Sequence, residues 1–187
     1  MLAVRFHGRG GQGAVIASKL LATALFREGW QVQAFPSFGA ERSGAPVAAF
    51  LRADHQRISD HSHIYHPDHV VVLDPILIQS VDVAAGLAPG GSILVNSSRP
   101  AESLGLPAGF KVTACDATAI ALKHGLGTRT TPLVNPAMAG AFAALTGLVR
   151  IEELMAAVRD LVPLKVEANQ AAAREAFESI AHPAVTG

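Results

Sequence analysis

A glycine-rich hexapeptide near the N-terminus is the part of the sequence best suited to bind a ligand. Gly8-Arg9-Gly10-Gly11-Gln12-Gly13 fits the pattern G-x-G-x-x-G. It separates an apolar segment that predicts a strand (2–6) from a segment with helical periodicity (14–28). Glycines permit positive φ angles and close backbone approach, and the amides at a helix start favour an anion. The spacing therefore indicates a site for a phosphate or another anion, with a tight turn that binds nothing as the alternative.

The second half of the dinucleotide fingerprint is missing. An NAD site needs an acidic residue at the end of the second strand to bind the ribose hydroxyls. The second predicted strand (31–35) is followed by Pro36 and Ser37, and the nearest acidic residues, Glu28 and Glu41, are misplaced. A free-standing NAD-binding oxidoreductase domain is therefore the weaker alternative, and no acid–base constellation supports it.

Strands and helices alternate along the chain, which is typical of an α/β protein. The strand, glycine loop, helix and strand over residues 2–35 form a βαβ unit, whose right-handed crossover predicts a parallel pair. A hairpin is expected from Val47–Arg52 and Gln56–Ser59. We expect one domain over residues 1–187, a three-layer αβα fold with a mostly parallel, mixed sheet, a Rossmann-like first βαβ unit and one hairpin. Further strands are expected at 69–75, 90–96 and 110–116, and helices near 135–147, 151–161 and 165–181.

Composition excludes several classes of protein. Half of the 187 residues are apolar and the net charge is zero, so no broad field attracts nucleic acid or an anionic membrane. No apolar run reaches the length of about 18 residues that a membrane span requires. The one cysteine, Cys115, cannot form an internal disulfide, a zinc cluster or an iron–sulfur site by itself. We expect a cytoplasmic protein, part of whose surface is covered by another subunit.

Other chemistry-bearing residues favour structural roles. The histidine-rich stretch 55–69 resembles a metal tract, but it has no helical i, i+4 pair and no cysteine, so a surface loop is the preferred interpretation. No metal site is expected. Asp74-Pro75 and Asn135-Pro136 each predict a helix N-cap followed by proline in the first turn. No residue is expected to be catalytic.

Several motifs occur together in one order. They are GRGGQG at 8–13, FGAERSGAPV at 38–47, PDHVVVLDP at 67–75, NPAMAGAF at 135–142, and K-x-x-x-N from Lys165 to Asn169. This pattern resembles the gamma subunit, or gamma domain, of the 2-oxoacid:ferredoxin oxidoreductases. The form Glu41-Arg42-Ser43-Gly44 resembles the pyruvate type, which usually reads ERRGAPV, with Ser43 in place of the second arginine.

The resemblance implies a non-catalytic gamma subunit of an enzyme of anaerobic metabolism. Such complexes convert a 2-oxoacid and coenzyme A to an acyl-CoA and CO2, and they pass two electrons to ferredoxin or another acceptor. Thiamine diphosphate, Mg2+ and the iron–sulfur clusters are expected in alpha, beta and delta-type subunits, with no cofactor bound by this chain alone. The sequence agrees, since it lacks a thiamine-binding Gly-Asp-Gly motif with an asparagine pair. Pyruvate is the leading substrate, and an aromatic 2-oxoacid such as phenylglyoxylate is the alternative.

The resemblance also implies a cofactor-binding or interface surface. Glu41 and Arg42 are expected to face a partner subunit or a CoA phosphate, although solvated loop charges are the simpler interpretation of the residues alone. Lys165 and Asn169 lie one turn apart on a predicted helix and share a side, where they either clamp the glycine loop or face solvent. The expected site comprises residues 8–13, Glu41, Arg42, Ser43, Gly44, Asn135, Lys165 and Asn169.

Overall fold

The computed structural model describes residues 1–37, 44–60 and 62–182. A six-stranded sheet has the order β2-β3-β1-β4-β5-β6. Its strands are β1 (Leu2–Arg9), β2 (Gln31–Pro36), β3 (Pro46–Asp54), β4 (His69–Val72), β5 (Ser92–Asn96) and β6 (Lys111–Cys115). The helices are α1 (Ala14–Arg27), α2 (Ala117–Lys123), α3 (Asn135–Thr146), α4 (Ile151–Leu161) and α5 (Val166–Ala181), with 3-10 helices η1 (Pro75–Gln79) and η2 (Ala101–Ser103). The α/β class and the three C-terminal helices are confirmed, whereas α2 was not predicted.

The sheet is mixed because β3 runs against its neighbours. Strands β1, β4, β5 and β6 are parallel, and β3 pairs antiparallel with both β1 and β2. The predicted pairing of β1 with β2 is therefore wrong. The two strands of the βαβ unit are separated by β3, whose Leu51 and Arg52 are buried on opposite faces of the sheet. A strand buried on both faces is stable inside a sheet rather than at its edge.

The hairpin is formed by a different pair of strands. Residues 46–54 form one continuous strand, so the predicted turn at 53–55 is wrong, and 56–59 is not a strand. Ala53 is paired on both sides, with Leu2 of β1 and Val32 of β2, which leaves no free edge at which residues 56–59 could pair. The hairpin is instead β2 followed by β3, joined across residues 37–45.

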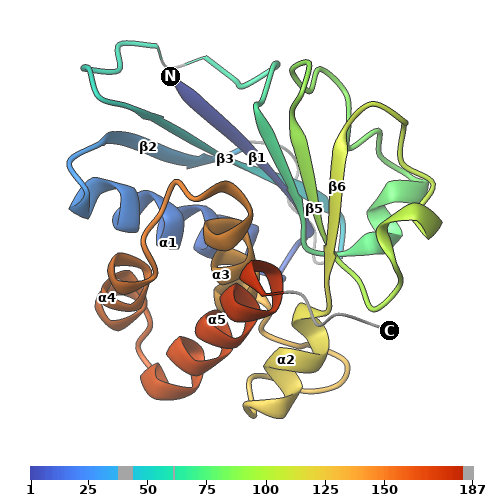
Figure 1. Cartoon of the computed structure of the whole chain (residues 1–187), viewed down its shortest axis with the longest axis vertical. Helices are drawn as coiled ribbons and strands as arrows, with labels where there is room; N and C mark the ends of the chain where they lie inside the picture. Colours follow the sequence, from blue (N-terminus) through green and yellow to red (C-terminus); the bar gives the residue numbers. More distant parts are fainter. Residues whose placement is uncertain (38–43, 61, 183–187) are drawn as a thin grey trace.

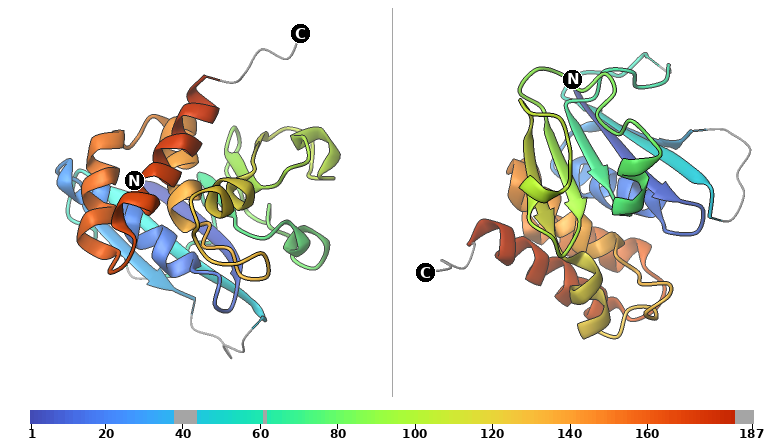
Figure 2. Two further views of the ribbon diagram at one scale, coloured as in Figure 1. Left: turned by 90° about the horizontal axis from the view of Figure 1, so that it is seen from below. Right: turned by 90° about the vertical axis from the view of Figure 1, so that its right-hand side faces the viewer.

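Two unequal layers cover the sheet. Figures 1 and 2 show α1, α3, α4 and α5 gathered on one side of it, where they enclose the main core with Phe6, Leu51 and Leu94. The opposite side of β4 and β5 is covered by η1 and the irregular segments near 80–88 and 104–110, which pack on Val72 and Val95. The third layer of the fold therefore consists of 3-10 helices and loops. Within the described ranges, no helix is both long and apolar enough to cross a membrane.

A buried arginine and histidine lie on the face of β1 that points away from the α-helices. Arg5 donates to the carbonyls of Val83 (3.1 Å) and Ala85 (2.6 Å), and its Nε donates to Nε2 of His7 at 3.0 Å. That nitrogen therefore carries no proton. Burial, and secondly the nearby Arg5 charge, lower the pKa of His7 to about 4.

This pair predicts acid sensitivity of folding. Between about pH 6.5 and pH 4 the unfolded chain protonates His7 and the folded chain does not, so the free energy of unfolding falls by about 3 kcal/mol as the pH decreases. His7→Gln keeps an acceptor for Arg5 and removes the titration. Urea unfolding at pH 7 and pH 4.5 should therefore show a smaller loss in the variant. An equal loss in both proteins would contradict this assignment.

Candidate functional site

The central crevice of the sheet lies between the ends of β1 and β4. After β1 the chain enters α1, which packs with β1, β2 and β3 on the helical face. After β4 the chain enters η1, whose Ile78 packs on the other face. Two parallel neighbours whose connections leave on opposite faces define a topological switch point, where open α/β sheets bind ligands beyond the carboxyl ends of their strands.

The glycine loop (residues 8–13) lies at this crevice. Gly11 and Gly13 have φ angles of 90° and 79°, which only glycine adopts without strain, and Gly13 is the N-cap of α1. The amide of Gly10 donates to the carbonyl of Ala45 at 2.9 Å, and the amide of Gly44 donates to the carbonyl of Gly10 at 3.3 Å. The structure therefore places Gly44 beside the glycine loop.

Arg9 and Gln12 are joined by a buried carboxylate. Asp74 Oδ2 accepts from Arg9 Nε at 2.6 Å and from Gln12 Nε2 at 2.7 Å, and its Oδ1 accepts from the amide of Ile76 at 3.0 Å. Gln12 Oε1 in turn accepts from the amide of Arg9 at 2.6 Å. Burial alone would raise the pKa of Asp74, but the hydrogen bonds from Gln12, Ile76 and Arg9 together lower it. Asp74 is therefore an anion at neutral pH.

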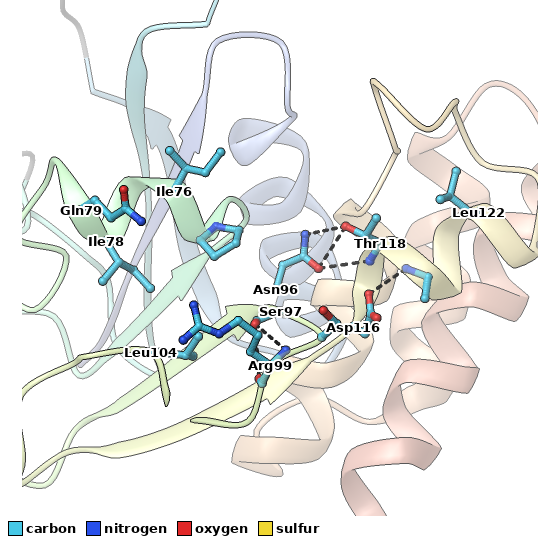
Figure 3. Close-up of a pocket in the computed structure, with 13 residues that line it drawn as sticks. Ile76, Ile78, Gln79, Asn96, Ser97, Arg99, Leu104, Asp116, Thr118 and Leu122 are labelled. Atoms are coloured by element: carbon cyan, nitrogen blue, oxygen red, sulfur yellow. Dashed lines mark hydrogen bonds between the residues drawn. The ribbon is translucent and has the colours of Figure 1, made fainter. Parts of the chain in front are cut away.

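A groove extends along this edge of the sheet. Its first half has a volume of about 520 Å3 and includes the glycine loop, Asp74 and the segment 129–134. Its second half, about 540 Å3, is shown in Figure 3 and lies beyond β5 and β6; the halves share Pro75, Asn96 and Thr118. The volume of each half lies within the range of small-molecule sites. We refer to both halves as the groove.

The dividing wall of the groove is a fixed polar pair. Asn96 donates to the carbonyl of Leu73 at 2.9 Å and to Thr118 Oγ1 at 3.0 Å, and it accepts from the Thr118 amide at 3.1 Å. These bonds join the ends of β4 and β5 to the first turn of α2. The wall is therefore part of the scaffold, with its hydrogen-bonding capacity largely used.

The charged residues of the groove favour an anion. Three arginines line it, Arg9, Arg99 and Arg129, against two aspartates, Asp74 and Asp116. The Asp74 carboxylate is bound by Arg9, Gln12 and the Ile76 amide. The Asp116 carboxylate accepts from the amide of Ala119 at 2.9 Å. Net positive charge together with loop amides is the arrangement that binds phosphate groups.

Asn135, the first residue of α3, contacts the glycine loop. Its amide packs on Gly13 so closely that a Cβ there would overlap Nδ2 and lie 2.7 Å from Oδ1. The predicted N-cap role is wrong: Val134 is the N-cap of α3, and Asn135 makes no capping hydrogen bond. The residue is 5% exposed, and its Oδ1 has no hydrogen-bond partner among the described residues. It fixes the distance between α1 and α3 at the glycine loop.

Comparison with known proteins places the chain in a family. A family model described as pyruvate ferredoxin/flavodoxin oxidoreductase matches residues 3–179. The chain belongs to this family. It is 49% identical over 184 residues to the pyruvate/ketoisovalerate oxidoreductases common subunit gamma of Pyrococcus abyssi, covering 95% of this chain and 96% of the relative. It is 46% identical over 181 residues to the pyruvate synthase subunit PorC of Methanothermobacter thermautotrophicus, covering 96% of each chain.

A solved structure supports the same assignment. The crystal structure of pyruvate oxidoreductase subunit PORC from Thermotoga maritima matches with a TM-score of 0.80 and 36% identity, covering 95% of both chains. The resemblance inferred from the ordered motifs is thus confirmed at the level of the family. The sheet and helices described above are the fold of this family.

Two residues of this pyruvate oxidoreductase family member do not form the expected clamp. Lys165 donates from Nζ to the carbonyl of Gly125 at 2.6 Å, at the end of α2. Asn169, only 6% exposed, donates to the carbonyls of Leu164 and Lys165 at the start of its own helix. Their hydrogen bonds thus hold the start of α5, so the predicted clamp on the glycine loop is wrong. The alternative prediction, that both side chains face solvent, is also wrong for Asn169, which is buried.

Other predicted site residues have different outcomes. Glu41, Arg42 and Ser43 lie outside the described residues, as does His61. In the histidine-rich stretch, His55 stacks on Trp30 at a ring distance of 3.9 Å. Within residues 1–37, 44–60 and 62–182, no three His, Cys, Asp or Glu side chains are grouped to hold a metal ion.

Several groove residues, among them Asp74, Asn96 and Arg129, were not predicted as site residues. The signal for the first two was present, because each lies at or just after the end of a parallel strand, where ligand-binding residues collect. Arg129 lies in a turn whose position follows only from the tertiary structure.

Proposed function

We propose that the chain is the gamma subunit of a cytoplasmic, CoA-dependent 2-oxoacid:ferredoxin oxidoreductase of the pyruvate type. The reaction converts pyruvate and CoA to acetyl-CoA, CO2 and a proton, with two electrons passed to ferredoxin or another acceptor. Alpha, beta and delta-type subunits would be its partners. The observation that carries this proposal is the similarity, over nearly the whole chain, to gamma-type subunits whose names specify pyruvate.

The cofactors of the reaction would be held by those partner subunits. Thiamine diphosphate with Mg2+ supplies the decarboxylation chemistry, and iron–sulfur clusters carry the electrons. The residues of this chain do not fit either group, because its one cysteine is buried and the thiamine motif is missing from the sequence. Burial raises the pKa of the Cys115 thiol to about 11, so the free thiolate is scarce at neutral pH.

The groove is proposed to receive the phosphate groups of CoA. The glycine loop lies at the N-terminus of α1, whose first-turn amides and dipole favour an anion. The Arg9 side chain is 41% exposed and lines the groove, so its guanidinium is within reach of a ligand. Contact with a partner subunit is the alternative role of the glycine loop, and also of Arg42.

Substitution of Arg9 tests the CoA contact in the assembled enzyme. Arg9→Gln should raise the KM for CoA about tenfold, the effect of losing one charge-assisted hydrogen bond of roughly 1.5 kcal/mol, without changing the KM for the 2-oxoacid. Arg159→Gln, on the exposed surface of α4, is the matched control. An unchanged KM for CoA in the Arg9 variant would contradict the contact.

Arg42→Glu distinguishes a partner contact from a CoA-phosphate contact for Arg42, in the motif FGAERSGAPV at 38–47. Loss of complex assembly indicates a partner contact, and a higher KM for CoA with normal assembly indicates a phosphate contact. If neither property changes, both interpretations of Arg42 are wrong.

Substrate specificity is tested with the same enzyme. Pyruvate, a branched-chain 2-oxoacid and phenylglyoxylate are compared for CoA-dependent reduction of ferredoxin. The pyruvate assignment predicts the highest kcat/KM with pyruvate, whereas preference for phenylglyoxylate would move the enzyme to the aromatic type.

A further inference from the structure

Asp74 connects two structural parts of the switch-point crevice through three hydrogen-bond donors. Its carboxylate receives Arg9 and Gln12 from the loop after β1 and the Ile76 amide from η1 after β4. It is 5% exposed, so its charge is balanced by these donors rather than by solvent. A buried carboxylate with three N–H donors restricts the positions that all three donors can take.

The way in which Arg9 is held matters for ligand binding. Only Nε of its guanidinium is bound to Asp74, and Nη1 and Nη2 have no partner among the described residues. A planar guanidinium fixed through Nε has its two outer nitrogens held in one orientation, and that orientation decides whether it can bind a phosphate through two hydrogen bonds. Gln12 fixes the loop backbone as well, since it bonds both Asp74 and the Arg9 amide.

We propose that Asp74 is a positioning residue that holds Arg9 and the glycine loop in the orientation in which they bind the anionic part of the substrate. The proposal rests on the assignment of the groove to CoA. It assigns to Asp74 a role besides the capping of η1, which uses only Oδ1. In this role the carboxylate acts through Arg9 and Gln12, whose side chains donate to its Oδ2.

Asp74→Asn separates positioning from simple electrostatics, because the two predict opposite changes. The asparagine oxygen still caps Ile76, but its NH2 group then faces the two donors Arg9 Nε and Gln12 Nε2, which lose their acceptor. Positioning therefore predicts a weaker contact with CoA. If the aspartate only lowered the positive potential of the groove, removing its charge would strengthen CoA binding, most clearly at low salt.

The experiment measures the KM for CoA in the complete complex. Asp74→Asn should raise it about tenfold, and the double variant with Arg9→Gln should raise it by less than the product of the two single effects, because both changes remove the Arg9 contact. Asp82→Asn is the control, since Asp82 also caps a backbone amide (Ala84, 3.2 Å) and lies outside the groove. An unchanged or lower KM for CoA in Asp74→Asn, alongside a raised value in Arg9→Gln, would overturn the positioning role and leave the CoA site standing.

Hydrogen exchange in the same complexes keeps the two proposals distinguishable. If neither Asp74→Asn nor Arg9→Gln changes the KM for CoA, the glycine loop does not bind CoA. The orientation of the loop is then tested directly by the exchange rates of its backbone amides. Faster exchange of the amides at residues 9–12 in Asp74→Asn, but not in Asp82→Asn, would still support positioning. Equal exchange in both variants would overturn it.

Discussion

Replacing Gly140 by alanine is expected to destabilise the chain by about 3 kcal/mol, at the upper end of what overpacking usually costs. Helices α3 and α5 cross at this residue, and an added Cβ would overlap the carbonyl oxygen of Ala173 and lie 2.7 Å from its carbonyl carbon. The obstacle is backbone inside a helix, and the neighbouring Phe142 and Ala173 are fully buried. The two helices must therefore separate. Urea unfolding of the purified chain measures the loss.

Gly147→Ala is the matched control for this prediction. Gly147 follows α3 with φ 65°, but an added Cβ has open space around it. That variant should lose only about 1 kcal/mol, the cost of placing a side chain in the left-handed region. If Gly140→Ala is no less stable than Gly147→Ala, the close crossing of α3 and α5 is wrong.

The second large effect is expected at Gly13. Alanine there meets both a positive φ of 79° and the amide of Asn135, whereas Gly11, with φ 90°, has no atom within 4 Å of an added Cβ. Gly13→Ala should therefore cost about 2–3 kcal/mol, and Gly11→Ala about 1 kcal/mol. Thermal or urea unfolding of the two variants makes the comparison, and the KM for CoA of the complexes reports the effect on the loop.

A double variant isolates the contact with Asn135. Combining Gly13→Ala with Asn135→Ala should recover part of the lost stability, because the overlap disappears and the strained φ remains. Equal losses for Gly13→Ala and Gly11→Ala would show that Asn135 does not restrict the loop.

Features with a local cause could be predicted from the sequence. The glycine loop before an apolar helical segment fixes the first strand–helix junction, and the apolar periodicity of 135–181 predicts three helices. The position of β3 could not be predicted, because pairing between β1, β2 and β3 is decided by burial on both faces of the sheet. Asp54 and His55 indicated a turn over residues 53–55, yet Ala53 is held in the strand by partners on both sides.

In the candidate site, too, local interactions could be predicted from the sequence and long-range contacts could not. Asp74 was predicted as a helix cap, and its bond to the Ile76 amide confirms that local role. Its bonds to Arg9 and Gln12 cross 65 and 62 positions of the sequence, so no local pattern reveals them. Lys165 adopts a φ of 53°, the one positive value at a non-glycine residue in the described ranges, and this backbone conformation helps direct its amine to α2 rather than to the glycine loop.

Anaerobic affinity purification of the tagged chain from its native host tests the central claim most directly. The account predicts that larger chains carrying thiamine diphosphate and iron–sulfur clusters co-purify in fixed ratio, and that the mixture reduces ferredoxin with pyruvate only when CoA is present. A chain that is recovered alone and free of cofactors would contradict the assignment as a gamma subunit. Saturable NAD binding by that isolated chain would then support the free-standing oxidoreductase instead.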